Sequence, residues 1–194
     1  MNAPGKLLLQ DGESVLFIGD SITDAGRQAD TLRSLGAGYV AHIADLLAAR
    51  YPDRRIGINN QGISGNRVVD LRARWDRDVV AHQPDWVSIS IGVNDVWRWF
   101  DGNPDAHIPI DEYRSVYHEL LVATVEKTDA RLILMETSVI GEEADNESNA
   151  MLAHYNEAIR EYAREHDAVG IIGHWVRLRS CSMGEQYRYS GARQ

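Results

Sequence analysis

Residues 14–23 read SVLFIGDSIT, a short apolar run that stops at the polar residues Asp20 and Ser21. Such a run predicts a strand that is buried on both faces, as in a parallel sheet. On either side of it, short apolar runs alternate with segments whose apolar residues recur at helical spacing. The predicted strands are 14–19, 55–59, 85–91, 131–136 and 168–172, and the predicted helices are 38–50, 66–82, 110–127 and 149–166. This alternation predicts an α/β fold, a three-layer αβα sandwich with a mostly parallel five-stranded sheet.

The composition predicts one globular domain over residues 1–194, because 44% of the residues are hydrophobic and 25% are charged. The net charge of -9 argues against nucleic acid as a partner and favours a soluble surface. The single cysteine, Cys181, excludes an internal disulfide. The apolar run at 7–9 is too short for a signal or membrane segment, so we expect a cytoplasmic protein without a membrane partner.

Polar segments follow the first three predicted strands, at the sheet edge where α/β proteins bind ligands. The first segment is GDSIT at 19–23. A serine at a strand-to-helix turn can project its hydroxyl into the crevice, which makes Ser21 a candidate nucleophile. The alternative is that Ser21 or Thr23 caps the next helix.

The second and third segments are NQGISGN at 60–66 and GVND at 92–95. Glycines permit left-handed dihedrals and close approach of a substrate to backbone N–H groups, although glycine-rich loops are also common without function. The Asn94 amide can donate to developing negative charge, or it can serve a turn or a helix cap. Together the three segments predict the nucleophile and oxyanion half of a serine ester hydrolase.

Three ordered blocks, VLFIGDSIT at 15–23, NNQGISGNRVVDLRARW at 59–75 and PDWVSISIGVNDVWR at 84–98, resemble the SGNH or GDSL hydrolase family. They are most similar to its bacterial serine acetylesterases, which act on xylan and xylo-oligosaccharides. The resemblance implies a flavodoxin-like fold with Ser21 as nucleophile. It also implies an oxyanion hole made by the Ser21 and Gly65 N–H groups and the Asn94 side chain.

The same resemblance implies that Asp20 supports the nucleophile and that Trp97 and Arg98 lie near the crevice rim. Trp97 could stack on a sugar; the alternative is a packed aromatic ring beside a surface cation. The substrate would be a small-molecule ester or an acetylated oligosaccharide, and the reaction would need no metal and no organic cofactor. A flavin-binding role for the same fold is disfavoured, because GDSITDAGR at 19–27 places two aspartates where a phosphate would bind.

The chain departs from the family where the general base is expected. The family places a D-x-x-H-P block behind the fifth strand, but the chain contains no D-x-x-H. His174 follows the fifth predicted strand without an aspartate at the family spacing, because position 171 is Ile. Residues 177–194 also lack any apolar period, so the segment after about 172 is atypical.

We therefore expect a weak or inactive esterase. The missing final helix would leave apolar sheet surface uncovered, which favours self-association as a homo-oligomer. The alternative is a catalytically inactive, truncated remnant that binds carbohydrate or serves in assembly.

Overall fold

A computed structural model describes residues 7–27, 34–141, 143 and 145–171. Its strands are β1 (Ser14–Gly19), β2 (Gly57–Gly62), β3 (Trp86–Ser90), β4 (Arg131–Met135) and β5 (Val169–Ile171). Its α-helices are α1 (Ser21–Asp24), α2 (Tyr39–Arg50), α3 (Val68–Asp78), α4 (Val93–Phe100), α5 (Ile110–Lys127) and α6 (Glu147–Glu165), with 3-10 turns η1 (Val80–His82) and η2 (Pro104–Ala106). The strands pair in parallel in the order β2-β1-β3-β4-β5. The predicted αβα fold is confirmed, and the described sheet is wholly parallel.

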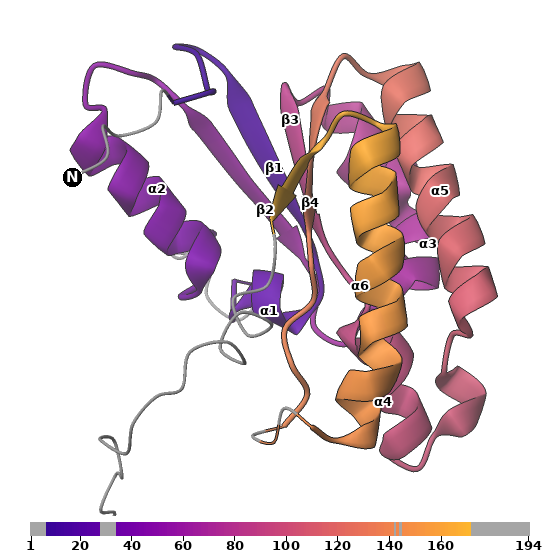
Figure 1. Cartoon of the computed structure of the whole chain (residues 1–194). Helices are drawn as coiled ribbons and strands as arrows, with labels where there is room; N and C mark the ends of the chain where they lie inside the picture. The colour runs from indigo at the N-terminus through magenta and orange to yellow at the C-terminus, as the bar shows by residue number, and fades with distance from the viewer. Residues whose placement is uncertain (1–6, 28–33, 142, 144, 172–194) are drawn as a thin grey trace, which may run out of the picture.

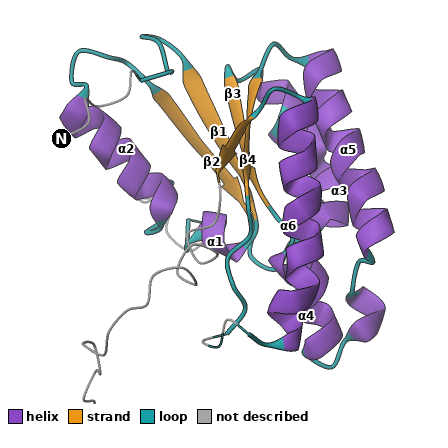
Figure 2. Ribbon diagram, viewed as in Figure 1, coloured by secondary structure: helices purple, strands orange, loops and turns teal. Residues whose placement is uncertain are grey.

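Helices cover the two faces of the sheet unequally (Figure 1). Helices α3, α5 and α6 lie together on one face, and α2 lies on the other (Figure 2). The larger apolar core fills the first side, with fully buried Tyr113 and Tyr117 of α5 and Tyr155 of α6. A smaller cluster packs Val40 of α2 against Val15 and other residues of the second face. None of the described helices combines the length and apolarity that a membrane crossing needs.

The second face is less well covered near β5. Val169 and Ile171 of this strand are 37% and 44% exposed. Side chains alternate along a strand, and Val169 lies in a shallow groove with Trp86 and Ile133 of the second-face cluster. Val169 and Ile171 thus expose apolar surface at the β5 end of the sheet, and the segment after 172, to which the prediction of an uncovered surface refers, lies outside the described residues.

Strand β2 begins and ends later than the apolar pattern predicts. The run RIGIN predicts a strand at 55–59, whereas β2 extends from Gly57 to Gly62. Its register with β1 pairs Ser14 with Gly57 and Gly19 with Gly62. The polar residues in this extension are satisfied inside the fold: the Asn60 amide donates to Thr23 O at 2.6 Å and to Leu35 O at 2.9 Å.

The predicted helix over 66–82 begins later and is interrupted. Arg67 is extended, and its N–H donates to the Asp70 carboxylate at 2.8 Å, so that α3 starts at Val68. Its α-helical part ends at Asp78, and η1 follows before Gln83 adopts a left-handed conformation (φ 44°). The next residue is a proline, which disfavours helical backbone at the position before it.

Helix α4 is absent from the sequence prediction. GVND reads as a turn because Gly, Asn and Asp favour turns, yet the helix begins at Val93. Its apolar side is fixed by tertiary contacts, with Val96 wholly buried and Phe100 packed against the main core.

Candidate active site

The register of the three neighbouring strands brings the predicted segments to one edge of the sheet. Gly19 at the end of β1 pairs with Gly62 of β2 on one side and with Ser90 of β3 on the other. Ser21 lies two residues beyond the first of these ends, and Gly65 and Asn94 lie shortly beyond the others. In sheets of this strand order, ligands bind outside the carboxyl ends of the strands, next to the first strand.

Close backbone packing fixes the turn that carries Ser21. A Cβ atom at Gly62 would lie 2.2 Å from the Asp24 backbone nitrogen, so only glycine allows β2 to approach α1 this closely. The Ile63 N–H donates to Gly19 O at 3.0 Å and joins the loop after β2 to the end of β1.

Ser21 is the first residue of α1, and its side chain is exposed. The cap of this helix is Asp20, whose Oδ1 accepts from the Ile22 N–H at 3.0 Å. Thr23 is bonded instead to the Tyr39 hydroxyl, at 3.0 Å. The alternative in which Ser21 or Thr23 caps this helix is therefore wrong, and the Ser21 hydroxyl is left exposed at the edge.

Asp20 is 2% exposed, and this burial raises the pKa of its carboxyl to about 6. The hydrogen bonds from Ile22 and from its own backbone N–H oppose that rise. The Asp20 side chain thus orders the first turn of the helix that carries Ser21, and its supporting role in catalysis stays a prediction.

The loop after β2 presents Gly65 with a left-handed backbone (φ 83°), which glycine adopts without strain. The loop is bonded to α1, and the end of β2 before it is fixed by a local bond. Ser64 donates to the Asp24 carboxylate through its hydroxyl at 2.6 Å, and the Gly62 N–H donates to Asn60 Oδ1 at 2.8 Å. The loop is thus tied to α1 and is not an isolated glycine-rich connection.

Asn94 lies in the first turn of α4, whose cap residue is Gly92 and receives no side-chain hydrogen bond. Asn94 therefore does not cap this helix. Its amide donates to Asn66 O at 3.0 Å, and this bond connects it to the residue that follows Gly65. An amide NH₂ has two hydrogens, so one donor is available besides that bond.

Asp95 is a buried carboxylate that the sequence did not single out, although it belongs to the GVND segment. Its Oδ1 accepts from the Val68 N–H at 2.9 Å, and its Oδ2 has no partner among the described residues. Burial raises its pKa to about 7, while the Val68 bond and the Arg67 charge oppose the rise. Asp95 thereby connects α4 with the start of α3.

The two rim candidates differ in environment. Trp97 is 41% exposed on α4. Arg98 pairs with Asp101 at 2.6 Å, and a Cβ atom at Gly65 would lie 3.8 Å from Arg98 Nη2. Trp97 is therefore no packed core aromatic, and Arg98 lies beside the Gly65 loop.

Three of the described histidines lie within helices, and a fourth, His107, contacts Asp95 beside Asn94. His42, His118 and His154 lie within α2, α5 and α6. His107 donates through Nδ1 to Asp95 O at 2.7 Å. Within the described ranges no histidine is hydrogen-bonded to Ser21. His174 lies outside the described residues, as do Cys181 and the atypical segment from 172.

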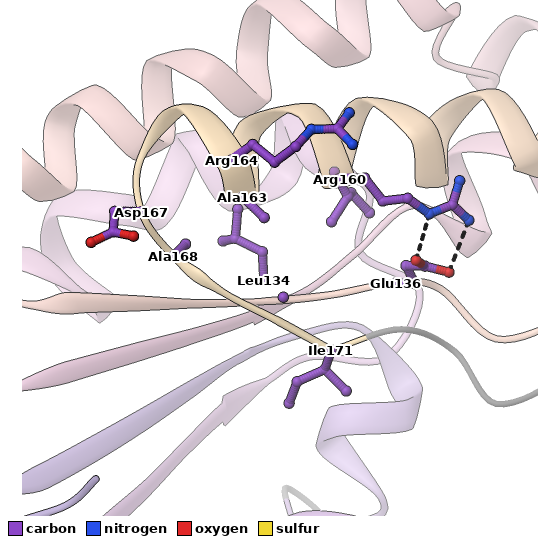
Figure 3. A pocket seen from close by; sticks show the side chains of 10 residues that line it. Leu134, Glu136, Arg160, Ala163, Arg164, Asp167, Ala168 and Ile171 are labelled. Carbon is purple, nitrogen blue, oxygen red and sulfur yellow. Dashed lines mark hydrogen bonds and ion pairs between the residues drawn. The ribbon is translucent and has the colours of Figure 1, made fainter.

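A cavity of about 540 Å³ opens elsewhere, between α6 and strands β4 and β5. Figure 3 shows its polar end, where Arg160 of α6 meets Glu136 at the end of β4. The two nitrogens Nε and Nη2 donate to the two carboxylate oxygens at 2.7 and 3.2 Å, so this pair neutralises itself. None of the predicted site residues lines the cavity. In the described part of the chain, no group of three or more His, Cys, Asp or Glu residues could hold a metal ion.

Comparison with known proteins places the chain among ester hydrolases. Residues 17–175 match the sequence model of the GDSL-like Lipase/Acylhydrolase family. An acetylxylan esterase from Geobacillus stearothermophilus is 42% identical over 160 residues, which cover 79% of this chain and 73% of that protein. The family match over 17–175 contains all three segments at the sheet edge.

Solved structures agree with this relationship. A crystal structure of an acetylxylan esterase from Geobacillus stearothermophilus has a TM-score of 0.77 and 40% identity, covering 82% of this chain and 75% of its own. An alpha/beta hydrolase enzyme from the metagenome of Lake Arreo, Spain, has a TM-score of 0.77 and 37% identity, covering 84% and 77%. The fold and the sequence therefore point to the same relatives.

Proposed function

Because this chain belongs to the GDSL-like lipase/acylhydrolase family of ester hydrolases, we propose that it cleaves acetyl esters of carbohydrate, with Ser21 as the nucleophile. The observation that carries the proposal is the paired register of Gly19 with Gly62 and Ser90, which supports a common site for Ser21, Gly65 and Asn94. The similarity to acetylxylan esterases supports an acetylated xylan or xylo-oligosaccharide as the substrate.

The proposed reaction has two stages. The Ser21 oxygen attacks the acetyl carbonyl as its proton passes to solvent water, and the carbonyl π electrons move to oxygen as the new C–O bond forms. The Ser21 and Gly65 N–H groups and the Asn94 amide donate to that oxyanion, where fixed donors are most effective. Collapse of the intermediate expels the sugar alkoxide, which takes up a proton, and leaves an acetyl-enzyme. Water then attacks this ester, and acetate leaves as Ser21 regains its proton.

Removal of the Ser21 hydroxyl proton is the step that limits this mechanism. A serine hydroxyl is a weak nucleophile without an adjacent base. The sequence contains no D-x-x-H, and no described histidine bonds to Ser21. We infer slow turnover: serine enzymes that lack a triad member keep about 10³–10⁴-fold acceleration over water.

A second candidate function is carbohydrate binding without significant turnover, and the same missing base favours it. Both candidates predict binding of an acetylated xylo-oligosaccharide. They differ in whether acetate is released.

The experiment measures acetate released from acetylated xylo-oligosaccharides and p-nitrophenolate released from p-nitrophenyl acetate, for the chain and for Ser21→Ala. We expect slow turnover of the activated ester that disappears in Ser21→Ala, and adduct formation at Ser21 with a small serine-reactive phosphonate, mapped by mass spectrometry. Equal turnover in Ser21→Ala, or phosphonate labelling at another serine, would contradict the assignment. Sugar binding without acetate release would favour the second candidate.

A further inference from the structure

Arg74 is a buried arginine of α3, 8% exposed, whose guanidinium reaches the carboxyl edge of the sheet. Its Nε donates to Asn66 Oδ1 at 2.8 Å, and its Nη2 donates to Gly19 O at 3.3 Å. Its Nη1 donates to Gln61 O at 2.9 Å and to Asp78 Oδ2 at 2.7 Å. All three nitrogens are therefore engaged, and three of these four bonds go to the ends of β1 and β2 or to the loop after β2.

Three of the acceptors, the Gly19 and Gln61 carbonyl oxygens and the Asn66 side chain, belong to residues around the candidate site. Gly19 O is two residues before Ser21. Asn66 directly follows Gly65, and its carbonyl oxygen accepts from the Asn94 amide at 3.0 Å. The Arg74 guanidinium thus contacts both the turn that carries Ser21 and the loop after β2. That loop contains Gly65, one proposed oxyanion donor, and accepts a hydrogen bond from Asn94, another.

A buried charge of this kind contributes little to the stability of the fold by itself. Taking an ion out of water costs several kcal/mol, and replacing a buried ion pair by apolar residues is often neutral or stabilising. Burial lowers the pKa of Arg74, and the Asp78 carboxylate opposes that shift. Asp78 is also paired with Arg77, whose side chain is 73% exposed.

The choice of arginine fits several acceptors in different segments. A guanidinium offers five N–H donors in a rigid planar fork, whereas lysine offers three on one rotating atom. Only a guanidinium can bond the ends of β1 and β2 and the loop after β2 while it also pairs with Asp78.

We propose that Arg74 is a positioning residue that holds the Ser21 turn and the Gly65 loop in their reactive arrangement. It acts through Gly19, Gln61 and Asn66 and does not touch the substrate. This inference rests on the proposed function, because it assumes that Ser21, Gly65 and Asn94 act together.

The test compares Arg74→Lys and Arg74→Gln with the matched control Arg77→Lys, which lies on the same helix and shares Asp78. Hydrogen exchange followed by mass spectrometry is measured on peptides spanning 16–24 and 61–67, with peptides from α5 and α6 as references. We expect both Arg74 variants to exchange about tenfold faster in those two peptides only, since local opening is set by local contacts. The control should match the parent chain.

Kinetics with p-nitrophenyl acetate give the second readout. We expect kcat to fall by about tenfold to a hundredfold in Arg74→Lys with KM nearly unchanged, because small misplacement of reacting groups is costly. Exchange that rises equally in α5 and α6, or that matches Arg77→Lys, would overturn the inference. If the parent chain shows no turnover, the proposed function fails, whereas the exchange comparison still decides whether Arg74 holds the two segments.

Discussion

Asp20 and Ser21 are adjacent in the chain and lie in opposite environments. The carboxylate turns inward to cap α1, and the hydroxyl stays exposed at the edge of the sheet. A cap bond typically contributes about 1 kcal/mol to helix stability. Asp20 therefore orders the backbone of α1, and the Ser21 side chain takes no part in the cap.

Asn94 provides a prediction at the same scale. Asn94→Ala should lower kcat by about 10²–10³, as the loss of an oxyanion donor does in other enzymes. Its bond to Asn66 O contributes about 1 kcal/mol, so the melting temperature should fall only slightly. Turnover of p-nitrophenyl acetate and thermal unfolding are measured side by side, with Asn103→Ala as a surface control. A large loss of melting temperature with unchanged kcat would mean that Asn94 is structural only.

Trp97 gives a second residue-scale prediction. If its exposed ring stacks on a sugar, Trp97→Ala should raise KM for an acetylated xylo-oligosaccharide severalfold and leave KM for p-nitrophenyl acetate unchanged. Loss of one stacking face costs about 1 kcal/mol. The matched control is Trp99→Ala, since Trp99 is 53% exposed on the same helix. Equal effects of the two substitutions on both substrates would exclude a specific sugar contact.

At the scale of elements, Asp95 joins α4 to the start of α3 through a single hydrogen bond. Its pKa is raised to about 7 in the folded chain, above the ordinary value of 3.8. The folded state therefore binds more protons than the unfolded state between about pH 4 and 7. The contribution of Asp95 to stability therefore falls as pH rises through this window, because deprotonation leaves a buried charge.

The corresponding prediction uses Asp95→Asn, which keeps an acceptor for the Val68 N–H and cannot ionise. Relative to the parent chain, the variant should gain on the order of a few kcal/mol in unfolding free energy between pH 5 and pH 8. Urea unfolding at both pH values measures the difference. Asp85→Asn is the control, because hydrogen bonds from Ser14 lower the Asp85 pKa and leave it ionised throughout. No change in the relative stability of Asp95→Asn across this range would contradict a raised pKa.

At the scale of the whole molecule, the sheet is well covered on the side of α3, α5 and α6 and thinly covered at β5 on the other. Exposed Val169 and Ile171 lie at the end of the described chain, next to the edge that carries the candidate site. The family resemblance places both the catalytic base and the last helix after this strand. A family-type segment after β5 would therefore both supply the proton acceptor that the proposed mechanism needs and cover this apolar surface.

This reasoning predicts the effect of appending a family-type segment with D-x-x-H-P after β5. Acetyl-ester hydrolysis should rise by several powers of ten, because an adjacent base activates the serine. The increase should vanish when Ser21→Ala is introduced into the extended chain. Strong activity in the unextended chain that His174→Ala abolishes would show instead that His174 already serves as the base.

Local pattern in the sequence was sufficient for the layer architecture, the five strands and the three polar segments behind β1, β2 and β3. The spacing of apolar residues and the polar residues that follow each strand depend only on residues close together in the chain. Both can therefore be recognised from the sequence alone. The bounds of α5, 110–127, follow from period alone for the same reason.

Helix α4, the extension of β2 and the contacts of Arg74 and Asp95 could not be read in this way. Asn60 looks unsuited to a buried strand position until Thr23 and Leu35 accept from its amide across the fold. Asp95 resembles a turn residue until burial removes it from water and raises its pKa. Pairing between distant residues decides the position of a polar group and its protonation, and only the folded chain creates those pairs.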